Sequence, residues 1–176
     1  MKINRIWAMP NKNTFEITPI KQIIHKYLKE KSIDPFANKN RIATISNDID
    51  PQYNTEYQMD ALDFLKRFPD KSINTVLFDP PYSPRQVSEV YKKVGKTVDM
   101  KTTQSSFWGN IKKEIKRIVC DEGIVISCGW NSGGIGKTAG FQIVEILLVP
   151  HGGWHNDTIV TVEKKQKNGR GHENRL

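Results

Sequence analysis

Residues 74–82 place a carboxylate, two prolines and an aromatic ring directly after a short apolar run. Residues 76–78, Val-Leu-Phe, favour a strand covered on both faces, as in the middle of a parallel sheet. Asp79 would then lie at the carboxyl end of that strand, where open α/β sheets bind their ligands. Pro80 and Pro81 end the hydrogen-bond ladder and hold φ near about −65°. The stretch therefore predicts a stiff turn that presents polar groups at a sheet edge.

This turn has the functional groups needed to hold an amino group on a planar ring. The two N–H donors of an exocyclic amine need two acceptors, which the Asp79 carboxylate and the Pro80 carbonyl supply. Tyr82 offers a ring face on which a nucleobase can stack. The simpler interpretation is a common strand-to-loop turn with a surface tyrosine, because four-residue motifs often match by chance.

Two further acids follow a second predicted strand, residues 41–46. An acid at the carboxyl end of a strand is the usual ligand of ribose hydroxyls in nucleoside-binding sheets. Asp48 has the best position for this role and Asp50 the second best. The alternative is a polar turn that Pro51 closes.

The rest of the pattern predicts the elements that would position these residues. Thr18-Pro19 starts an amphipathic helix over residues 19–30, and shorter helices are expected from residue 59, around residues 87–91 and from residue 107. Strands are expected over residues 123–128, 141–149 and 158–162, the last two as an antiparallel edge hairpin. This alternation predicts an α/β fold with a mostly parallel sheet.

Composition narrows the class of protein. The chain has 176 residues, a net charge of +8 and a pI of about 9.5, which fit one basic domain and favour a polyanionic partner such as nucleic acid. Without a run of about 18 apolar residues or an apolar signal segment, we expect a cytoplasmic protein without membrane contact. Cys120 and Cys128 are expected to be reduced core residues. We expect the domain to span residues 1–163, with a loose basic tail over residues 164–176.

Three short motifs occur in an order that carries a family resemblance. Asp-Pro-Phe-Ala stands at residues 34–37, Asp-Ala at residues 60–61 and Asp-Pro-Pro-Tyr at residues 79–82. With the acid after the second strand, this order resembles S-adenosylmethionine-dependent amino methyltransferases, which modify adenine N6 or cytosine N4. The resemblance covers roughly residues 14–163 and points to the small DNA adenine methyltransferases of phages and mobile elements. It implies a Rossmann-like methyltransferase sheet.

The resemblance also implies S-adenosylmethionine as cofactor and direct methyl transfer to adenine N6 in DNA, because Asp at the first motif position favours adenine over cytosine. The implied catalytic residues are Asp79, Pro80, Pro81 and Tyr82, and the implied cofactor-binding residues are Phe15, Asp34, Pro35, Phe36, Asp48, Asp60 and Ala61. Asp60 has an N-cap as its alternative role.

Nucleic-acid contacts are predicted from position in the chain. Arg85, close to the turn, would hold a phosphate, and Trp130 and Asn131 would line the base pocket; surface or structural roles are the alternative. DNA is the expected partner. No target-recognition domain is added, so recognition of a target sequence would come from loops or from a second chain that completes the site. That chain would be a homodimer mate or a partner protein.

The cofactor loop departs from the family pattern in two ways. Asn38-Lys39-Asn40 stands where the family has Gly-Ser-Gly, which hinders close approach to a ligand, although Asn tolerates a positive φ. The strand at residue 41 also begins too soon for a crossover helix, which needs on the order of a dozen residues. Either the first strand is vestigial or the helix is deleted, leaving the pocket open on one side. These departures motivate a second hypothesis, a non-catalytic relative that binds nucleic acid or a partner chain.

Two other motifs predict different chemistry. Residues 129–138 end in Gly-Lys-Thr like a nucleotide-binding P-loop, which gives a third hypothesis of a nucleotide hydrolase. However, Asn131 stands where that motif needs its first glycine, and a strand rather than a helix is expected to follow. His151, His155 and Asp157 have metal-ligand side chains, but they lie in a glycine-containing turn without a cysteine, so we predict no metal site.

Overall fold

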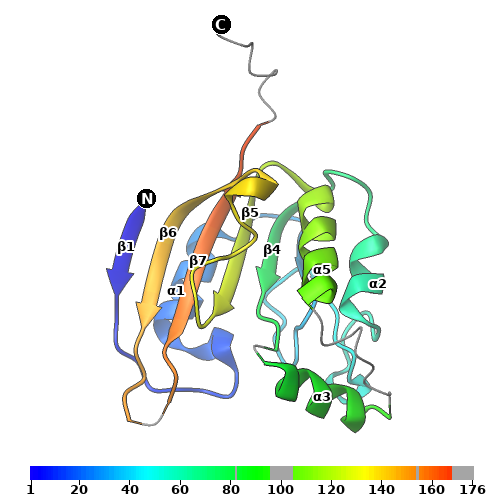
Figure 1. Ribbon diagram of the computed structural model, residues 1–176, viewed down its shortest axis with the longest axis horizontal. Helices are drawn as coiled ribbons and strands as arrows, with labels where there is room; N and C mark the ends of the chain where they lie inside the picture. The colour runs from blue at the N-terminus through cyan, green and yellow to red at the C-terminus, as the bar shows by residue number, and fades with distance from the viewer. Residues whose placement is uncertain (82, 96–104, 154, 168–176) are drawn as a thin grey trace, which may run out of the picture.

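The computed structural model describes residues 1–81, 83–95, 105–153 and 155–167, which form one seven-stranded sheet (Figure 1). In spatial order its strands are β1 (Lys2–Arg5), β6 (Phe141–Val149), β7 (Thr158–Lys165), β5 (Val119–Gly129), β4 (Ile73–Phe78), β2 (Ser32–Asp34) and β3 (Ile45–Ser46). Neighbouring strands are parallel except that β7 runs antiparallel to β5 and β6. The predicted α/β class and the mostly parallel sheet are confirmed.

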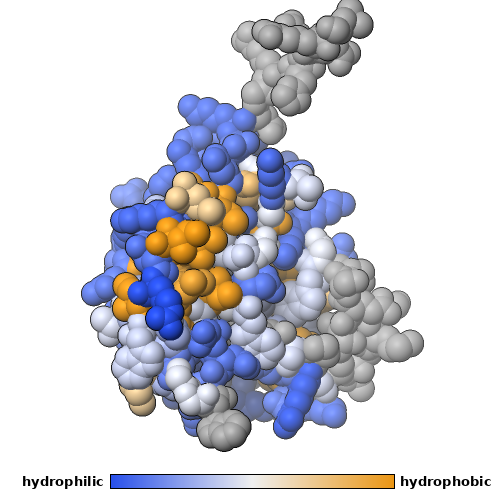
Figure 2. Space-filling view, turned by 60° about the vertical axis from the view of Figure 1, so that its left-hand side comes forward, coloured by the Kyte–Doolittle hydropathy of each residue, from blue (hydrophilic) through white to orange (hydrophobic). Residues whose placement is uncertain are grey.

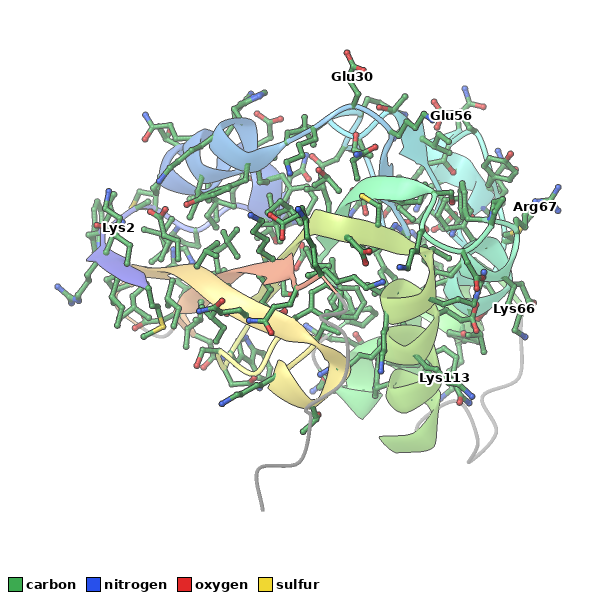
Figure 3. The ribbon with its side chains drawn as sticks, turned by 90° about the horizontal axis from the view of Figure 1, so that it is seen from above. Lys2, Glu30, Glu56, Lys66, Arg67 and Lys113 are labelled. Atoms are coloured by element: carbon green, nitrogen blue, oxygen red, sulfur yellow. The ribbon has the colours of Figure 1, made fainter. Side chains whose placement is uncertain are left out.

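Helices cover both faces of this sheet. α1 (Thr18–Tyr27) lies on one face, α2 (Ala61–Lys66) and α5 (Ser105–Ile118) lie on the other, and α3 (Pro84–Lys93) lies beyond the end of β4 (Figures 1 and 3). The 3-10 helices are η1 (Thr14–Glu16), η2 (Pro51–Tyr53) and η3 (Lys137–Ala139). Charged side chains such as Lys66 and Lys113 point outward from the rim (Figure 3). Within the described ranges, no helix has the length and apolar character needed to cross a membrane.

β4 lies between two parallel neighbours, and this explains why Asp79 comes at the sheet edge. Val76 packs in the apolar cluster under α2 and α5, whereas Leu77 packs in the cluster under α1, and both side chains are fully buried. Pairing with β5 continues to Phe78. The two following prolines cannot donate to the ladder. The predicted central strand is confirmed, and it ends beside β2 and β5.

The connection between β2 and β3 has no helix. The two strands pair in parallel, so residues 35–44 make the whole crossover as a loop. β2 has three residues and β3 two, fewer than the strand predicted over residues 41–46. Arg41 holds the loop by donating Nη1 to the carbonyls of Asn38 and Asn40, at 3.0 and 2.6 Å. The sequence suggested either a vestigial first strand or a deleted crossover helix. Both are seen, because β2 and β3 are short and no helix connects them.

β1 lies outside the hairpin of β6 and β7, so the edge position predicted for that hairpin is wrong. The N-terminal segment lacks an alternating pattern, since Lys2, Ile3 and Arg5 are all exposed. Its pairing depends on a distant partner: Asn4 Nδ2 donates to Glu145 Oε1 at 2.7 Å. Figure 2 shows apolar residues gathered on this side of the molecule, where Ile3 is 59% exposed.

α5 and β5 join without an intervening turn, because the strand begins at the residue after the helix ends. The helix end is capped from β7. Lys165 is buried and donates Nζ to the carbonyls of Lys116 and Val119 at 2.7 and 2.6 Å. A cation suits the negative end of a helix. Lys164 and Lys165, which the predicted domain boundary placed in the tail, therefore belong to β7.

The Gly-Lys-Thr segment after β5 has a carboxylate where a P-loop would have phosphate. The loop over residues 130–136 meets β7, where the buried Glu163 accepts from the N–H groups of Ile135 and Gly136 at 2.6 and 2.9 Å. P-loops need such N–H groups for phosphate. Burial raises the pKa of Glu163, against the opposing effect of these two bonds. Glu163 therefore occupies donors that the nucleotide-hydrolase hypothesis requires.

We expect Glu163→Ala to lower the free energy of unfolding by about 2–4 kcal/mol, because two N–H groups lose their acceptor and each buried orphan costs about 1–3 kcal/mol. Urea denaturation followed by circular dichroism measures this loss. The control is Glu122→Ala, which removes a half-exposed ion pair with Lys164 and should change stability little. Equal losses in the two variants would contradict the role given to Glu163.

The histidine-containing turn before β7 is held by hydrogen bonds. His151 is buried, with Nδ1 at 2.8 Å from the Ala8 carbonyl oxygen and Nε2 at 2.9 Å from Thr158 Oγ1. Asp157 accepts the His151 N–H at 3.4 Å, whereas His155 is exposed. In the part of the chain that the structure describes, no three metal-ligand side chains converge. His151 therefore ties the N-terminal segment to β7.

Candidate active site

A cavity of about 330 Å³ lies at the carboxyl ends of β2, β3 and β4. Its walls come from the segments after these strands, from one side of α3 and from the first turns of α5. The residues predicted for cofactor binding and catalysis that line it are Pro35, Phe36, Asp48, Asp60, Ala61, Asp79, Pro80 and Pro81. Three motifs that are far apart in the sequence therefore meet at one edge of the sheet.

Asp79 and the two prolines form the wall next to β4. All three are partly exposed at the cavity. Since neither proline has an N–H, this wall offers acceptors, the Asp79 carboxylate and the proline carbonyls. α3 starts directly afterwards with a capping box, in which Ser83 Oγ accepts the Gln86 N–H and Gln86 Oε1 accepts the Ser83 N–H, each at 3.2 Å. Tyr82, the last residue of the motif, lies outside the described residues.

Asn38 takes the place of the missing glycine. Its φ is 51°, in the left-handed region that Asn tolerates. Its N–H donates to Asp48 Oδ2 at 2.9 Å, and the preceding Ala37 N–H donates to the Asn47 carbonyl at 2.9 Å. The loop therefore turns sharply without glycine, as expected, but it uses one carboxylate oxygen of Asp48 to do so.

Asp48 and Asp50 lie on the same wall of the cavity, but they differ in how many hydrogen-bond acceptor positions are left for a ligand. Asp48 accepts one N–H on each oxygen, from Asn38 and from Asp50, both at 2.9 Å. Asp50 Oδ2 accepts twice, from Gln52 Nε2 at 2.5 Å and Lys93 Nζ at 2.9 Å, and Oδ1 accepts the Gln52 N–H at 3.0 Å. A carboxylate oxygen has two lone pairs, so Asp48 keeps one position on each oxygen. Asp48 can therefore accept from two neighbouring hydroxyls and Asp50 from one.

Asp34 lies behind the cavity wall rather than in it. It is 1% exposed, and its Oδ1 accepts the Phe36 N–H at 3.0 Å. Its buried Oδ2 has no hydrogen-bond partner among the described residues. Burial raises the pKa of Asp34 well above its usual value, and the charges of Asp79 and Asp48 raise it further. Burial also raises the pKa of Asp48. The three acids therefore lie close enough together at this end of the sheet for their charges to interact.

Asp60 has two partners. Its Oδ1 caps α2 by accepting the Leu62 N–H at 2.8 Å, which confirms the N-cap role. Its Oδ2 accepts the hydroxyl of Tyr91 on α3. The adjacent Ala61 is 5% exposed at the cavity wall. Because α3 contacts Asp60, the helix that follows Pro81 reaches the part of the cavity wall formed at the start of α2.

Asn47 organises the loops around the cavity, a role that sequence reasoning missed. This fully buried side chain donates Nδ2 to the carbonyls of Pro35 and Met59, each at 3.0 Å, and its Oδ1 accepts the Met59 N–H at 3.2 Å. One side chain thus joins the segments after β2 and β3 to the segment before α2. The signal in the sequence was an amide directly after a strand, next to the acid that was singled out.

α3 and α5 supply cavity residues that were assigned only to helix faces. Val87 and Val90 of α3 line the cavity, as do Phe107 and Trp108 of α5. The Phe36 ring lies 6.3 Å from the Trp108 ring, centroid to centroid. The absence of a crossover helix between β2 and β3 led us to expect a pocket open on one side. α3 instead covers part of the pocket.

Besides Asp34, four of the predicted site residues that the structure describes are not on the cavity wall. Phe15 is fully buried in the core under α1, and its neighbour Thr14 lines the cavity instead. Arg85 is exposed and pairs with Glu89 at 2.8 Å. Trp130 is 47% exposed, and Asn131 accepts the Gly133 N–H at 2.9 Å in the loop that meets Glu163. Helix periodicity and strand order do not reveal which way such side chains point.

No protein-family model matches the sequence, and no curated protein matches it. Solved structures do match the fold. TrmN from Thermus thermophilus matches with a TM-score of 0.55 and 16% identity over 85% of this chain, which spans about half (49%) of TrmN. A 1,6-didemethyltoxoflavin-N1-methyltransferase from Burkholderia thailandensis, solved with bound 1,6-didemethyltoxoflavin and S-adenosylhomocysteine, matches with a TM-score of 0.56 and 11% identity over 85% of this chain and 77% of that one.

A putative rRNA methylase from Clostridium thermocellum matches with a TM-score of 0.51 and 11% identity over 89% of this chain and 100% of that one. Sequence identities this low are evidence for a shared fold and not for a shared substrate or activity. The chain has the Rossmann-like α/β fold that these methyltransferases share.

Proposed function

We propose that this chain is an S-adenosylmethionine-dependent methyltransferase that methylates the N6 amino group of adenine in DNA. The observation that carries the proposal is the meeting of Asp79 and its prolines with Asp48 and Asp60 in one cavity at the carboxyl end of the sheet. Open α/β sheets bind nucleotide-like ligands at this edge. The shared fold with methyltransferases supports the reaction class.

The residues of the cavity fit the cofactor. Asp48 keeps two acceptor positions for a ribose diol, and Ala61 leaves room beside Asp60 for an adenine ring. When bound, S-adenosylmethionine supplies a sulfonium-activated methyl group.

The role of Asp79 and Pro80 is to hold the acceptor. The carboxylate and the carbonyl would each accept a hydrogen bond from one N–H group of the adenine amino group. This arrangement would orient the nitrogen lone pair toward the methyl donor. The Asp79 carboxylate would stabilise the positive charge that develops on the nitrogen, which then loses one proton to solvent to leave the neutral methylamino group. No covalent bond to the protein is needed. The target base would leave the duplex to reach the cavity.

The net charge of the chain and the Asp-Pro-Pro-Tyr motif both support DNA as the substrate. The chain carries a net charge of +8, and Lys12 lies at the cavity itself. Phosphate contacts from lysines would bring the strand to the site without reading its sequence. Recognition of a target sequence would come from loops or from a second chain, as a homodimer mate or a partner protein.

A non-catalytic binding module is the second candidate. It is favoured by the crossover that lacks both glycines and a helix, since Asn38 consumes one acceptor position on Asp48. In this case the cavity would bind nucleic acid or a partner without transferring a methyl group.

One experiment separates these functions. The purified chain is incubated with S-adenosylmethionine labelled in its methyl group and with matched DNA, RNA and adenine-free DNA. Label in N6-methyladenine from DNA alone is the expected result, and label in RNA would redirect the substrate. Absence of calorimetric binding of S-adenosylmethionine, with or without DNA, would refute the methyltransferase and favour the binding module.

A further inference from the structure

The wall that carries Asp48 and Asp50 has no crossover helix behind it. In its place, α3 reaches across the cavity with two polar side chains. Tyr91 donates its hydroxyl to Asp60, and Lys93 Nζ lies 2.9 Å from Asp50 Oδ2. Both bonds join the helix that follows the catalytic motif to acids of the cofactor wall.

We propose that Lys93 is a positioning residue for the cofactor site: by pairing with Asp50 it holds the turn over residues 48–53, so that Asp48 presents an acceptor position on each oxygen to a ribose diol. The inference rests on the proposed function and adds a residue to it. Lys93 acts through Asp50 and does not touch the reacting atoms.

The contacts form a continuous chain. Lys93 holds the Asp50 carboxylate, the Asp50 N–H donates to Asp48 Oδ1 at 2.9 Å, and Asp48 Oδ2 accepts the Asn38 N–H at 2.9 Å. The Asp50 side chain is 10% exposed, and Lys93 Nζ also lies 5.6 Å from the centroid of the Tyr53 ring. An ion pair with one shielded partner fixes geometry better than a fully exposed pair.

The charges around Asp48 give Lys93 a second effect. Asp50 lies two residues after Asp48 in the same turn. Asp34 of β2 lies near both Asp48 and Asp79, and the positive charge of Arg41 in the crossover loop lowers the pKa of Asp34. Burial raises the pKa of Asp48, the Asp50 charge adds to this, and Lys93 counters it. Without Lys93, Asp48 would bind a proton at a higher pH and lose an acceptor position.

Calorimetry tests this with S-adenosylhomocysteine and its 2′-deoxy analogue as probes, at about pH 6 and about pH 8, a range in which a carboxyl group titrates only if its pKa is raised. The wild-type chain should prefer the ribose form. Lys93→Met should bind S-adenosylhomocysteine about tenfold more weakly at the higher pH, and more weakly still at the lower pH. It should also lose most of the preference for the 2′-hydroxyl. Lys93→Arg should restore both properties.

Lys92→Met is the matched control, because Lys92 is exposed one position earlier on the same helix. Circular dichroism and thermal melting of each variant monitor folding. Equal weakening of both probes at both pH values would show a merely structural role and overturn the proposal, as would Lys93→Met binding like Lys92→Met. Absence of binding by the wild-type chain would instead refute the proposed function, and the inference with it.

Discussion

Replacement of Asp79 by alanine should reduce methyl transfer to adenine by about a thousandfold or more, with cofactor binding changed by less than about threefold. The carboxylate supplies one of two acceptors for the amino group, so its loss leaves the base held by a carbonyl alone and the developing charge unsupported. Asp79 lies at the end of β4, whereas Asp48 and Asp60 belong to other segments of the wall. Single-turnover transfer of labelled methyl and calorimetry measure the two effects separately.

Two further variants sharpen this prediction. Asp79→Asn keeps one acceptor oxygen and should fall between the wild type and the alanine variant. Asp63→Ala removes an exposed acid of α2, 3.5 Å from Lys66, and should leave transfer unchanged. If Asp79→Ala transferred methyl as fast as Asp63→Ala, Asp79 would have no part in catalysis.

Asp34→Asn is expected to make folding stability less sensitive to rising pH. Burial raises the pKa of Asp34 well above 3.8 in the folded chain. Below 3.8 the carboxyl is protonated in both states; as the pH rises, the unfolded chain ionises first, so stability falls until the raised pKa is passed. The slope is at most about 1.4 kcal/mol per pH unit for one proton. Asparagine cannot ionise, and its oxygen can still accept the Phe36 N–H.

Calorimetric melting of both proteins from about pH 4 to about pH 8 measures this difference. The melting temperature of Asp34→Asn should rise relative to the wild type as the pH increases. Asp48 and Glu163 also have raised pKa values, but they are present in both proteins and cancel in the difference. Asp63→Asn, at an exposed position, should show no such trend. A difference that does not vary with pH would mean that Asp34 is ionised as easily in the folded chain as in the unfolded one.

Local patterns in the sequence predicted the elements whose faces are fully buried. β4 has Val76 and Leu77 packed on opposite faces, and such a run is recognisable without tertiary information. The hairpin of β6 and β7 was predicted for the same reason. β1 was missed because its side chains are mostly exposed and its pairing comes from Asn4 and Glu145, which are far apart in the sequence.

The sequence by itself determined the α/β class, the central strand that ends at Asp79, and the sharp turn at Asn38, because strand patterns, prolines and left-handed residues act through the nearest neighbours in the chain. Only the tertiary structure decided which polar groups share partners. It placed Glu163 on the N–H groups of the P-loop-like segment and Lys93 on Asp50. Such pairings join side chains from elements that meet only after folding, and the spacing of residues within one element does not show which distant group will lie opposite.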